Sequence, residues 1–375
     1  MGYILKQYDT DLMKFDIFND FDGMTTKISW IDESKKHLLP LDLQENNDSL
    51  TKWIKGRTIP SNRAYVENFL AKLGLNEKDS KGIIDICKGL SLNDSYWIVD
   101  EHFSGSFEKH NLYHNPFSLT IALIAFTGYG SVNRTTFRSS PEFTTNGMLA
   151  KCWRRVGGKI MLYKSGTEGF ANSGKEPYSE FYAYQIAEAM GLNAVKYNLS
   201  VWKGKLCSTC ELFTDIDTSY IPIGRLVKEG GVRAVLKYLK ELGDEYYQAV
   251  IDMFVFDAVI CNTDRHFGNY GVLVDNKTNE IKGIALIFDN GLSLFHYAMD
   301  DDLRDIKAYA KTRTPSTYPD FVQFAKENMS KRQKDMLRKL LEFKFKKHPR
   351  YNLDDKRLKI IEKFINDRAK ELLAE

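Results

Sequence analysis

Residues 261–271 read CNTDRHFGNYG and place an aspartate, an arginine, a histidine and an asparagine within six positions, from Asp264 to Asn269. The preceding residues 244–262, DEYYQAVIDMFVFDAVICN, carry apolar side chains on nearly all sides of a helical axis, which predicts a helix buried inside a lobe. The following residues, YGVLVD, are typical of a strand. The polar cluster is therefore expected in a short loop between a buried helix and a strand.

A second polar position lies further along the chain. Asp289 follows the apolar run IALIF, twenty residues after Asn269, and precedes Asn290 and Gly291. Aspartate, asparagine and glycine are common loop formers, so NTDRHFGN alone could be an ordinary turn between a helix and a strand. We expect IALIF to be a buried strand, and a buried strand rarely ends in a carboxylate for packing reasons. The two segments together favour a functional site.

The residue types match the needs of phosphoryl transfer. That reaction requires a cation for the phosphates, ligands for magnesium, and a base or orienting group for the attacking hydroxyl. Asp264 would accept or orient the hydroxyl proton, while Asn269, five residues later, and Asp289 offer the hard oxygen atoms that magnesium prefers. The spacing from Asp264 to Asn269 equals that of the kinase catalytic loop. His266 would stabilise the loop or the developing charge on the phosphate.

The segment upstream of this loop has a regular order of elements. Residues 144–166, TTNGMLAKCWRRVGGKIMLYKSG, predict two strands joined by a Gly157-Gly158 turn, with Lys164 near the end of the second strand. Residues 176–191 predict a helix with Pro177 near its start and Gly191 at its end. The segments KYNLSVW and KLCSTCELF predict a second hairpin, and residues beyond 214 are mostly helical.

The paired motifs NTDRHFGN and IFDNG resemble those of the HipA-like serine/threonine kinases, from about Thr144 to the C-terminus. The resemblance implies an α+β, two-lobed protein-kinase-like fold with a β-rich N-lobe and a helical C-lobe, preceded here by a small additional α+β unit. It also implies ATP and Mg²⁺ as cofactors, Asp264 as the catalytic residue with His266 in support, and Asn269 and Asp289 as the metal ligands.

The same resemblance assigns residues to the nucleotide. The family's phosphate loop is similar to TTNGMLAK, with Gly147 and Lys151 in the matching places, and its ATP-binding lysine is matched by Lys164. The hinge that pairs with adenine is similar to Glu211 and Phe213, and Thr144 stands where some relatives carry an autophosphorylated serine. This loop has a single glycine where protein kinases use several. The helix carboxylate that pairs with the lysine could be Glu180 or Glu188; Glu180 is favoured because it is nearer the start of its helix.

Bulk composition narrows the class of protein. The chain has 375 residues, 43% hydrophobic and 27% charged, enough for more than one core. Its 53 basic and 50 acidic residues are too balanced to indicate a nucleic-acid or membrane partner.

The longest apolar run, SLTIALIAF, is too short to cross a bilayer and predicts a buried helix. Without a signal-peptide pattern we expect a cytoplasmic protein with reduced cysteines, and Cys207 and Cys210 lack a second ligand pair for zinc.

Three regions are predicted along the chain. Residues 1–135 form an N-terminal unit and connector, in which MTTKISWID predicts a strand and SNRAYVENFLAKLGL predicts a helix that buries Tyr65, Phe69, Leu70 and Leu73. Residues 136–213 form the N-lobe with the phosphate loop, and residues 214–375 form the helical C-lobe with the catalytic loop.

Three functions are consistent with these residues. The first is a serine/threonine protein kinase, with a protein substrate and an antitoxin-like regulator. The second is a phosphatidylinositol or small-molecule kinase, although Asp300, Asp301 and Asp302 stand where an anionic head group would favour basic residues. The third is a non-catalytic nucleotide-binding module of the toxin-antitoxin type. The presence of Lys164, Asp264, Asn269 and Asp289 argues against it, because a dead kinase has usually lost at least one.

Overall fold

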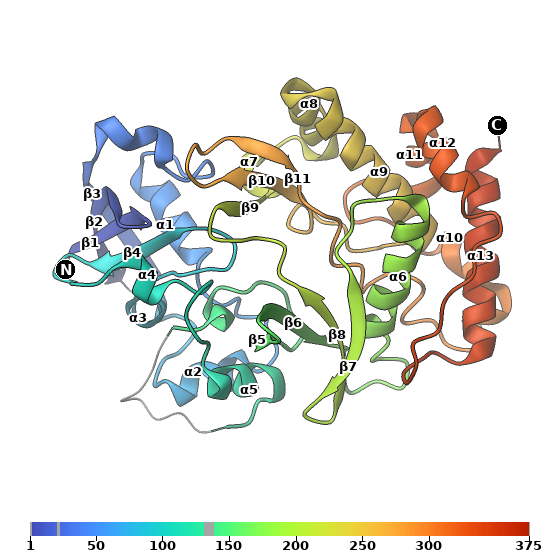
Figure 1. Ribbon diagram of the computed structural model, residues 1–375, viewed down its shortest axis with the longest axis horizontal. Helices are drawn as coiled ribbons and strands as arrows, with labels where there is room; N and C mark the ends of the chain where they lie inside the picture. Colours follow the sequence, from blue (N-terminus) through green and yellow to red (C-terminus); the bar gives the residue numbers. More distant parts are fainter. Residues whose placement is uncertain (1, 21–22, 131–138, 375) are drawn as a thin grey trace. The chain divides into compact units, whose positions relative to one another are not determined.

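The computed structural model describes residues 2–20, 23–130 and 139–374. Figure 1 labels the helices and strands along the chain. The chain divides into two compact units, each assembled from separate segments. Unit one comprises Met1–Lys164, Glu211–Ile221 and Leu273–Lys282, and unit two comprises Ser165–Cys210, Pro222–Val272 and Gly283–Glu375. The predicted boundary between residues 135 and 136 lies outside the described residues.

The first part of unit one is an antiparallel sheet with strands in the order β3-β2-β1-β4. The strands are β1 (Gly2–Gln7), β2 (Thr10–Asp20), β3 (Gly23–Ile31) and β4 (Tyr96–Asp100). Strand β1 pairs with β2 on one side and with β4 on the other, with Tyr3 opposite Phe15 and Asp100. The strand predicted from MTTKISWID is therefore confirmed as β3.

The helices of unit one share buried hydrophobic clusters with this sheet. They are η1 (Glu33–Leu38), α1 (Asn47–Lys55), α2 (Val66–Lys72), α3 (Ser80–Cys87), α4 (Phe107–His110), α5 (Leu119–Thr127) and η3 (Pro141–Phe143). Phe69 and Leu70 of α2 are buried in this core, as the helical pattern predicts. Tyr65 is not part of the helix: it is the residue before α2 and has a positive φ of 63°. The helical stripe is thus one turn shorter than predicted.

Two smaller β structures complete unit one. The predicted hairpin is confirmed as β5 (Lys151–Val156) and β6 (Lys159–Ser165), whose turn residues Gly157 and Gly158 have φ values of 58° and 81°. Two consecutive positive φ values are the geometry of a tight hairpin turn, which glycine adopts without strain. A three-stranded sheet in the order β11-β10-β9 is formed by β9 (Thr218–Pro222), β10 (Gly271–Asp275) and β11 (Ile281–Ile284).

Unit two is mainly helical. Its helices are α6 (Glu176–Met190), α7 (Ile223–Leu226), α8 (Gly231–Leu242), α9 (Asp244–Ile260), η4 (Asp302–Asp305), α10 (Ile306–Lys311), α11 (Phe321–Asn328), α12 (Lys331–Arg338) and α13 (Asp355–Leu373). Strands β7 (Tyr197–Trp202) and β8 (Lys205–Glu211) form the second predicted hairpin. Helix α6 ends at Gly191, which has a φ of 79°, as its sequence predicts.

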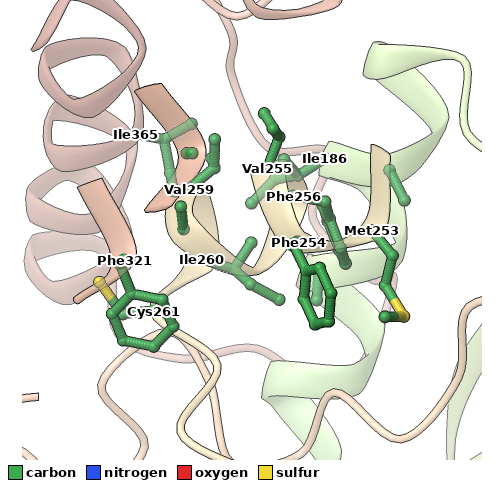
Figure 2. Close-up of a cluster of buried hydrophobic side chains, with 14 of the residues drawn as sticks. Ile186, Met253, Phe254, Val255, Phe256, Val259, Ile260, Cys261, Phe321 and Ile365 are labelled. Atoms are coloured by element: carbon green, nitrogen blue, oxygen red, sulfur yellow. The ribbon is translucent and has the colours of Figure 1, made fainter. Parts of the chain in front are cut away.

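Helix α9 is the centre of unit two. Every residue from Val250 to Ile260 is buried, which explains why its apolar side chains surround the helical axis. Figure 2 shows this cluster, in which side chains of α9 pack beside Ile186 of α6, Phe321 of α11 and Ile365 of α13. The helix ends at Cys261, which has a φ of 51°, and the chain turns there into the predicted loop.

The segment IALIF departs from the prediction. Strand β11 ends at Ile284, so Asp289 does not stand at the end of a continuous strand. Ile287 instead forms an isolated parallel bridge with Ala194: Ile287 N–H donates to the oxygen of Asn193, and Val195 N–H donates to the oxygen of Ile287, both at 2.9 Å. The apolar run is explained by burial of Ala285 and Ile287, and its backbone changes partners along its length.

Two further features bear on the sequence predictions. The five cysteines, all within the described residues, are buried and form no disulfide bond, and Cys207 and Cys210 both lie on β8. The apolar run at residues 118–126 forms most of the buried helix α5. Within the described ranges, no helix combines the length and the hydropathy that crossing a membrane would require.

Candidate functional site

The loop after α9 is held by hydrogen bonds among its own polar groups. Asn262 Oδ1 accepts from the backbone N–H of Asp264 at 3.1 Å, and His266 N–H donates to the Asp264 oxygen at 2.8 Å. Asn269 Nδ2 donates to the same Asp264 oxygen at 2.9 Å. Because the amide nitrogen of Asn269 is used inside the loop, its amide oxygen is the atom left to bind a cation. The loop thus brings Asp264 and Asn269 together.

His266 lies on the exposed side of the loop. Its Nδ1 accepts from the backbone N–H of Gly268 at 3.0 Å, so in the neutral ring the proton is on Nε2. A Cβ at position 268 would come within 2.8 Å of the ring, which explains the glycine there. The ring is therefore fixed with its Nε2–H available as a donor.

Arg265 is the buried centre of the site. Its Nε and Nη2 donate to the two carboxylate oxygens of Asp257, at 2.9 and 3.0 Å, and both side chains are fully buried. Burial by itself would lower the pKa of Arg265, but the nearby carboxylates, Asp257 above all and also Asp289 and Glu180, together outweigh this effect and raise the pKa. The guanidinium is therefore a permanent cation whose planar shape matches the carboxylate.

The remaining donors of Arg265 connect the loop to the Asp289 segment. Nη1 donates to the backbone oxygens of Asn269 and Phe288, and Nη2 donates to Asn290 Oδ1 at 2.6 Å. One side chain thus holds residue 269 on one side and the two neighbours of Asp289 on the other. The same guanidinium therefore binds the backbone of one predicted metal ligand, Asn269, and the residues on either side of the other, Asp289.

Asp289 has a strained backbone that several groups support. Its φ is 55°, a conformation that costs about 1–3 kcal/mol for residues other than glycine. Its backbone N–H donates to the hydroxyl of Tyr197 at 3.2 Å, and the next N–H, of Asn290, donates to Glu180 Oε2 at 2.7 Å. Glu180 is buried on α6, whereas Glu188 on the same helix is exposed. Of the two candidate carboxylates, Glu180 is the one that contacts the Asp289 segment.

The donor set suits a magnesium ion. Within the described ranges, no group of three or more histidine, cysteine, aspartate or glutamate residues could hold a metal. A metal here would depend on the amide oxygen of Asn269, the carboxylate of Asp289, water and phosphate oxygens. Hard oxygen donors with few protein ligands are the usual environment of magnesium bound with a nucleotide. The residues present therefore fit this ion.

The predicted nucleotide residues lie in unit one. Lys151 and Lys164 face each other across the β5-β6 hairpin, and both are buried. Lys151 Nζ donates to the Asn146 oxygen at 2.8 Å, and Gly147, with a φ of 94°, lies so close that a Cβ would be 2.2 Å from that nitrogen. The segment TTNGMLAK is thus a loop closed by its own lysine, and Gly147 is needed for the close approach.

The other predicted positions of unit one make contacts with different residues. Thr144 is buried, and its hydroxyl donates to the oxygen of Leu90 at 2.9 Å. Glu211 is exposed and forms an ion pair with Lys159 at 2.6 Å. The ring of Phe213 packs edge-on against Tyr220, with centroids 5.6 Å apart.

Five residues of the site were given no role from the sequence: Tyr197, Asp257, Asn262, Arg265 and Asn290. Asp257 carries a signal that could have been used, because it is a carboxylate inside a helix that is otherwise apolar and buried. Asn290 adjoins Asp289 in the motif itself. Tyr197 has no local signal, since its role depends on a contact with a residue 92 positions away.

The chain is similar to a known protein in sequence and to solved structures in fold. No family model matches the chain. The serine/threonine-protein kinase CtkA of Helicobacter pylori strain J99 is 28% identical over 139 residues, which cover 33% of this chain and 42% of the relative. The chain thus matches less than half of that relative's length.

Two solved structures share the fold. The crystal structure of the Helicobacter pylori proinflammatory kinase CtkA has a TM-score of 0.51 at 18% identity, covering 61% of this chain and 90% of that chain. The Shewanella oneidensis HipA, in a toxin-antitoxin complex with HipB and operator DNA, has a TM-score of 0.55 at 10% identity. The match covers 98% of this chain and 96% of that chain. The mixed α and β elements and these likenesses confirm the predicted α+β, two-lobed kinase-like fold. The partial sequence match and the shared fold support the resemblance to the HipA-like kinases that the motifs indicate.

Proposed function

We propose that this chain is a kinase that uses ATP and Mg²⁺ to phosphorylate a serine or threonine hydroxyl of a protein. The observation that carries the proposal is the shared attachment at Arg265, which binds the backbone oxygens of Asn269 and of Phe288, the residue before Asp289. A buried, permanently charged group that binds the backbone of Asn269 and the neighbours of Asp289 supports the rigid arrangement that a phosphoryl-transfer site needs.

The catalytic loop supplies the groups that act on the hydroxyl. In this proposal Asp264 orients the attacking hydroxyl and accepts its proton, and its position is fixed by bonds to Asn262 and Asn269. The exposed His266 offers its Nε2–H to the phosphate. Magnesium, held by the Asn269 amide oxygen and the Asp289 carboxylate, would neutralise charge on the phosphate oxygens.

Unit one would supply the nucleotide contacts. Lys164 is a buried cation near the end of β6, which supports its assignment to the ATP phosphates. The closed loop that contains Gly147 and Lys151 would contribute backbone N–H groups and a second cation. The backbone at Glu211 and Phe213 would pair with adenine. These assignments follow the family resemblance and the burial of the two lysines.

Regulation by a partner and by phosphorylation is also proposed. The Shewanella HipA structure contains HipB and operator DNA, which supports an antitoxin-like regulator here. Thr144 is the candidate for autophosphorylation. Its hydroxyl is buried against the Leu90 oxygen, so its modification would require this segment to open.

A lipid or small-molecule kinase is the alternative, and the acidic run Asp300–Asp302 argues against an anionic lipid. The test is incubation of the purified chain with Mg²⁺ and ATP labelled on its γ-phosphate. Parallel samples receive a cell lysate, phosphatidylinositol vesicles or neither. Label on protein is the expected result. Label on lipid would support the alternative, and no transfer in any sample would refute the kinase proposal.

A further inference from the structure

Tyr197 lies beside Asp289 because of the backbone pairing that precedes it. Ala194 and Ile287 form a parallel bridge, with hydrogen bonds on both sides of Ile287. Because the two segments run in parallel, the same register two residues further along places residue 196 opposite residue 289. The aromatic side chain of Tyr197, at the start of β7, then places its hydroxyl 3.2 Å from the Asp289 backbone nitrogen.

The three residues around Asp289 are each held by a different contact. Arg265 donates a hydrogen bond to the Phe288 oxygen. The Tyr197 hydroxyl accepts from the Asp289 N–H, and the Glu180 carboxylate accepts from the Asn290 N–H. Of these three groups, Arg265 also contacts Asn269 and Asp257, so its loss would disturb the whole loop. The hydroxyl of Tyr197 acts on Asp289 itself.

We propose that Tyr197 is a positioning residue for metal binding: its buried hydroxyl holds the Asp289 backbone in the positive-φ conformation from which this carboxylate binds the ion. The inference rests on the proposed role of Asp289 as a metal ligand. Removal of the hydroxyl leaves a backbone N–H without its acceptor, which favours other conformations of Asp289. The metal affinity should fall, while contacts made by unit one with the nucleotide stay intact.

The test is a Mn²⁺ titration, followed by the electron paramagnetic resonance signal of free Mn²⁺, with a non-hydrolysable ATP analogue present. Tyr197→Phe should raise the dissociation constant for Mn²⁺ about five- to thirtyfold and change metal-free binding of the analogue by less than about twofold. The matched control is Tyr318→Phe. Tyr318 is also buried in unit two, and its hydroxyl has no hydrogen-bond partner in the described part of the chain, so Mn²⁺ binding should not change.

A second substitution separates this inference from the proposed function. Asp289→Asn should weaken Mn²⁺ binding, and adding Tyr197→Phe to that variant should weaken it no further. Normal Mn²⁺ binding by Tyr197→Phe, together with loss in Asp289→Asn, would overturn the positioning role alone. Equal binding by the parent and Asp289→Asn would overturn both proposals.

If thermal denaturation shows that Tyr197→Phe does not fold, amide hydrogen exchange of the unaltered protein tests the role of Tyr197 instead. Slow exchange at Asp289 is expected for an amide bonded to a buried hydroxyl, and fast exchange would overturn the proposal.

Discussion

Asp257 and Arg265 form a fully buried ion pair, with Arg265 Nε 2.9 Å from Asp257 Oδ2. The aspartate belongs to the central helix α9, and the arginine belongs to the loop that follows it. The pair therefore fixes the polar loop to the most buried element of unit two. Because the same arginine binds Asn269, Phe288 and Asn290, the geometry of the candidate metal site depends on the packing of α9.

Loss of the arginine should destabilise the protein strongly. Arg265→Leu leaves the Asp257 carboxylate buried without its partner, and this should reduce the free energy of unfolding of unit two by about 3–5 kcal/mol. Arg338→Leu is the matched control, because Arg338 pairs with Asp335 at the surface and its loss should cost less than about 1 kcal/mol. Urea denaturation measures both. Similar losses for the two variants would contradict the central role of Arg265.

Lys164→Ala should weaken the binding of ATP. Lys164 is a buried cation on β6, and loss of a charged contact to the phosphates should raise the ATP dissociation constant by about tenfold or more. The control is Lys159→Ala on the same strand, since Lys159 is exposed and pairs with Glu211. Calorimetric titration with ATP and Mg²⁺ would compare the two. An unchanged affinity for Lys164→Ala would remove this residue from the nucleotide site.

The two glutamates of α6 should differ in importance. Glu180→Gln keeps an oxygen to accept the Asn290 N–H but removes the buried charge, and we expect the rate of phosphoryl transfer to fall by about tenfold or more. Glu188→Gln changes an exposed side chain that bonds Tyr184, so its rate should remain within about twofold of the parent. Steady-state kinetics at saturating ATP decides between them. A greater effect at Glu188 would reverse the assignment.

His296 should make stability depend on pH. Burial lowers its pKa to about 4, with Arg313 and Arg357 acting in the same direction and Glu176 opposing them. Between pH 6.5 and 4 the unfolded chain binds a proton at this position that the folded chain does not, so stability falls as the pH falls through this range. From pH 7 to pH 5 the loss from this residue should be about 2 kcal/mol.

His296→Gln should remove that part of the pH dependence. Urea denaturation at pH 7, 6 and 5 measures it, and substitution of the exposed His102 provides the control. The account of His296 fails if the parent and His296→Gln lose the same stability between pH 7 and pH 5.

The sequence predicts those parts of the fold whose cause is local. Helix α9, the β5-β6 hairpin and the end of α6 at Gly191 follow from apolar periodicity and glycine positions, and the structure confirms them. The run IALIF was predicted wrongly as one strand, because apolar residues indicate burial but do not indicate which partner the backbone takes. Its pairing changes from β10 to residues 193–195, and only the tertiary structure determines this.

The candidate site divides in the same way. Asp264, His266, Asn269 and Asp289 were chosen for their chemistry and their spacing, and the first three lie in one hydrogen-bonded loop. The groups that support them were missed because they act through contacts between distant segments. Tyr197 is 92 residues from the Asp289 amide that it binds, and Glu180 is 110 residues from the Asn290 amide. The periodicity of a sequence does not predict contacts between such distant residues.

The most direct test of the central claim compares ATP binding with phosphoryl transfer in Asp264→Ala. The loop should bind the attacking hydroxyl through Asp264 and the nucleotide through other groups. We therefore expect the affinity for ATP and Mg²⁺ to stay within about threefold of the parent, while transfer of the labelled γ-phosphate falls by about a hundredfold or more. Transfer at the parent rate by Asp264→Ala would contradict the account.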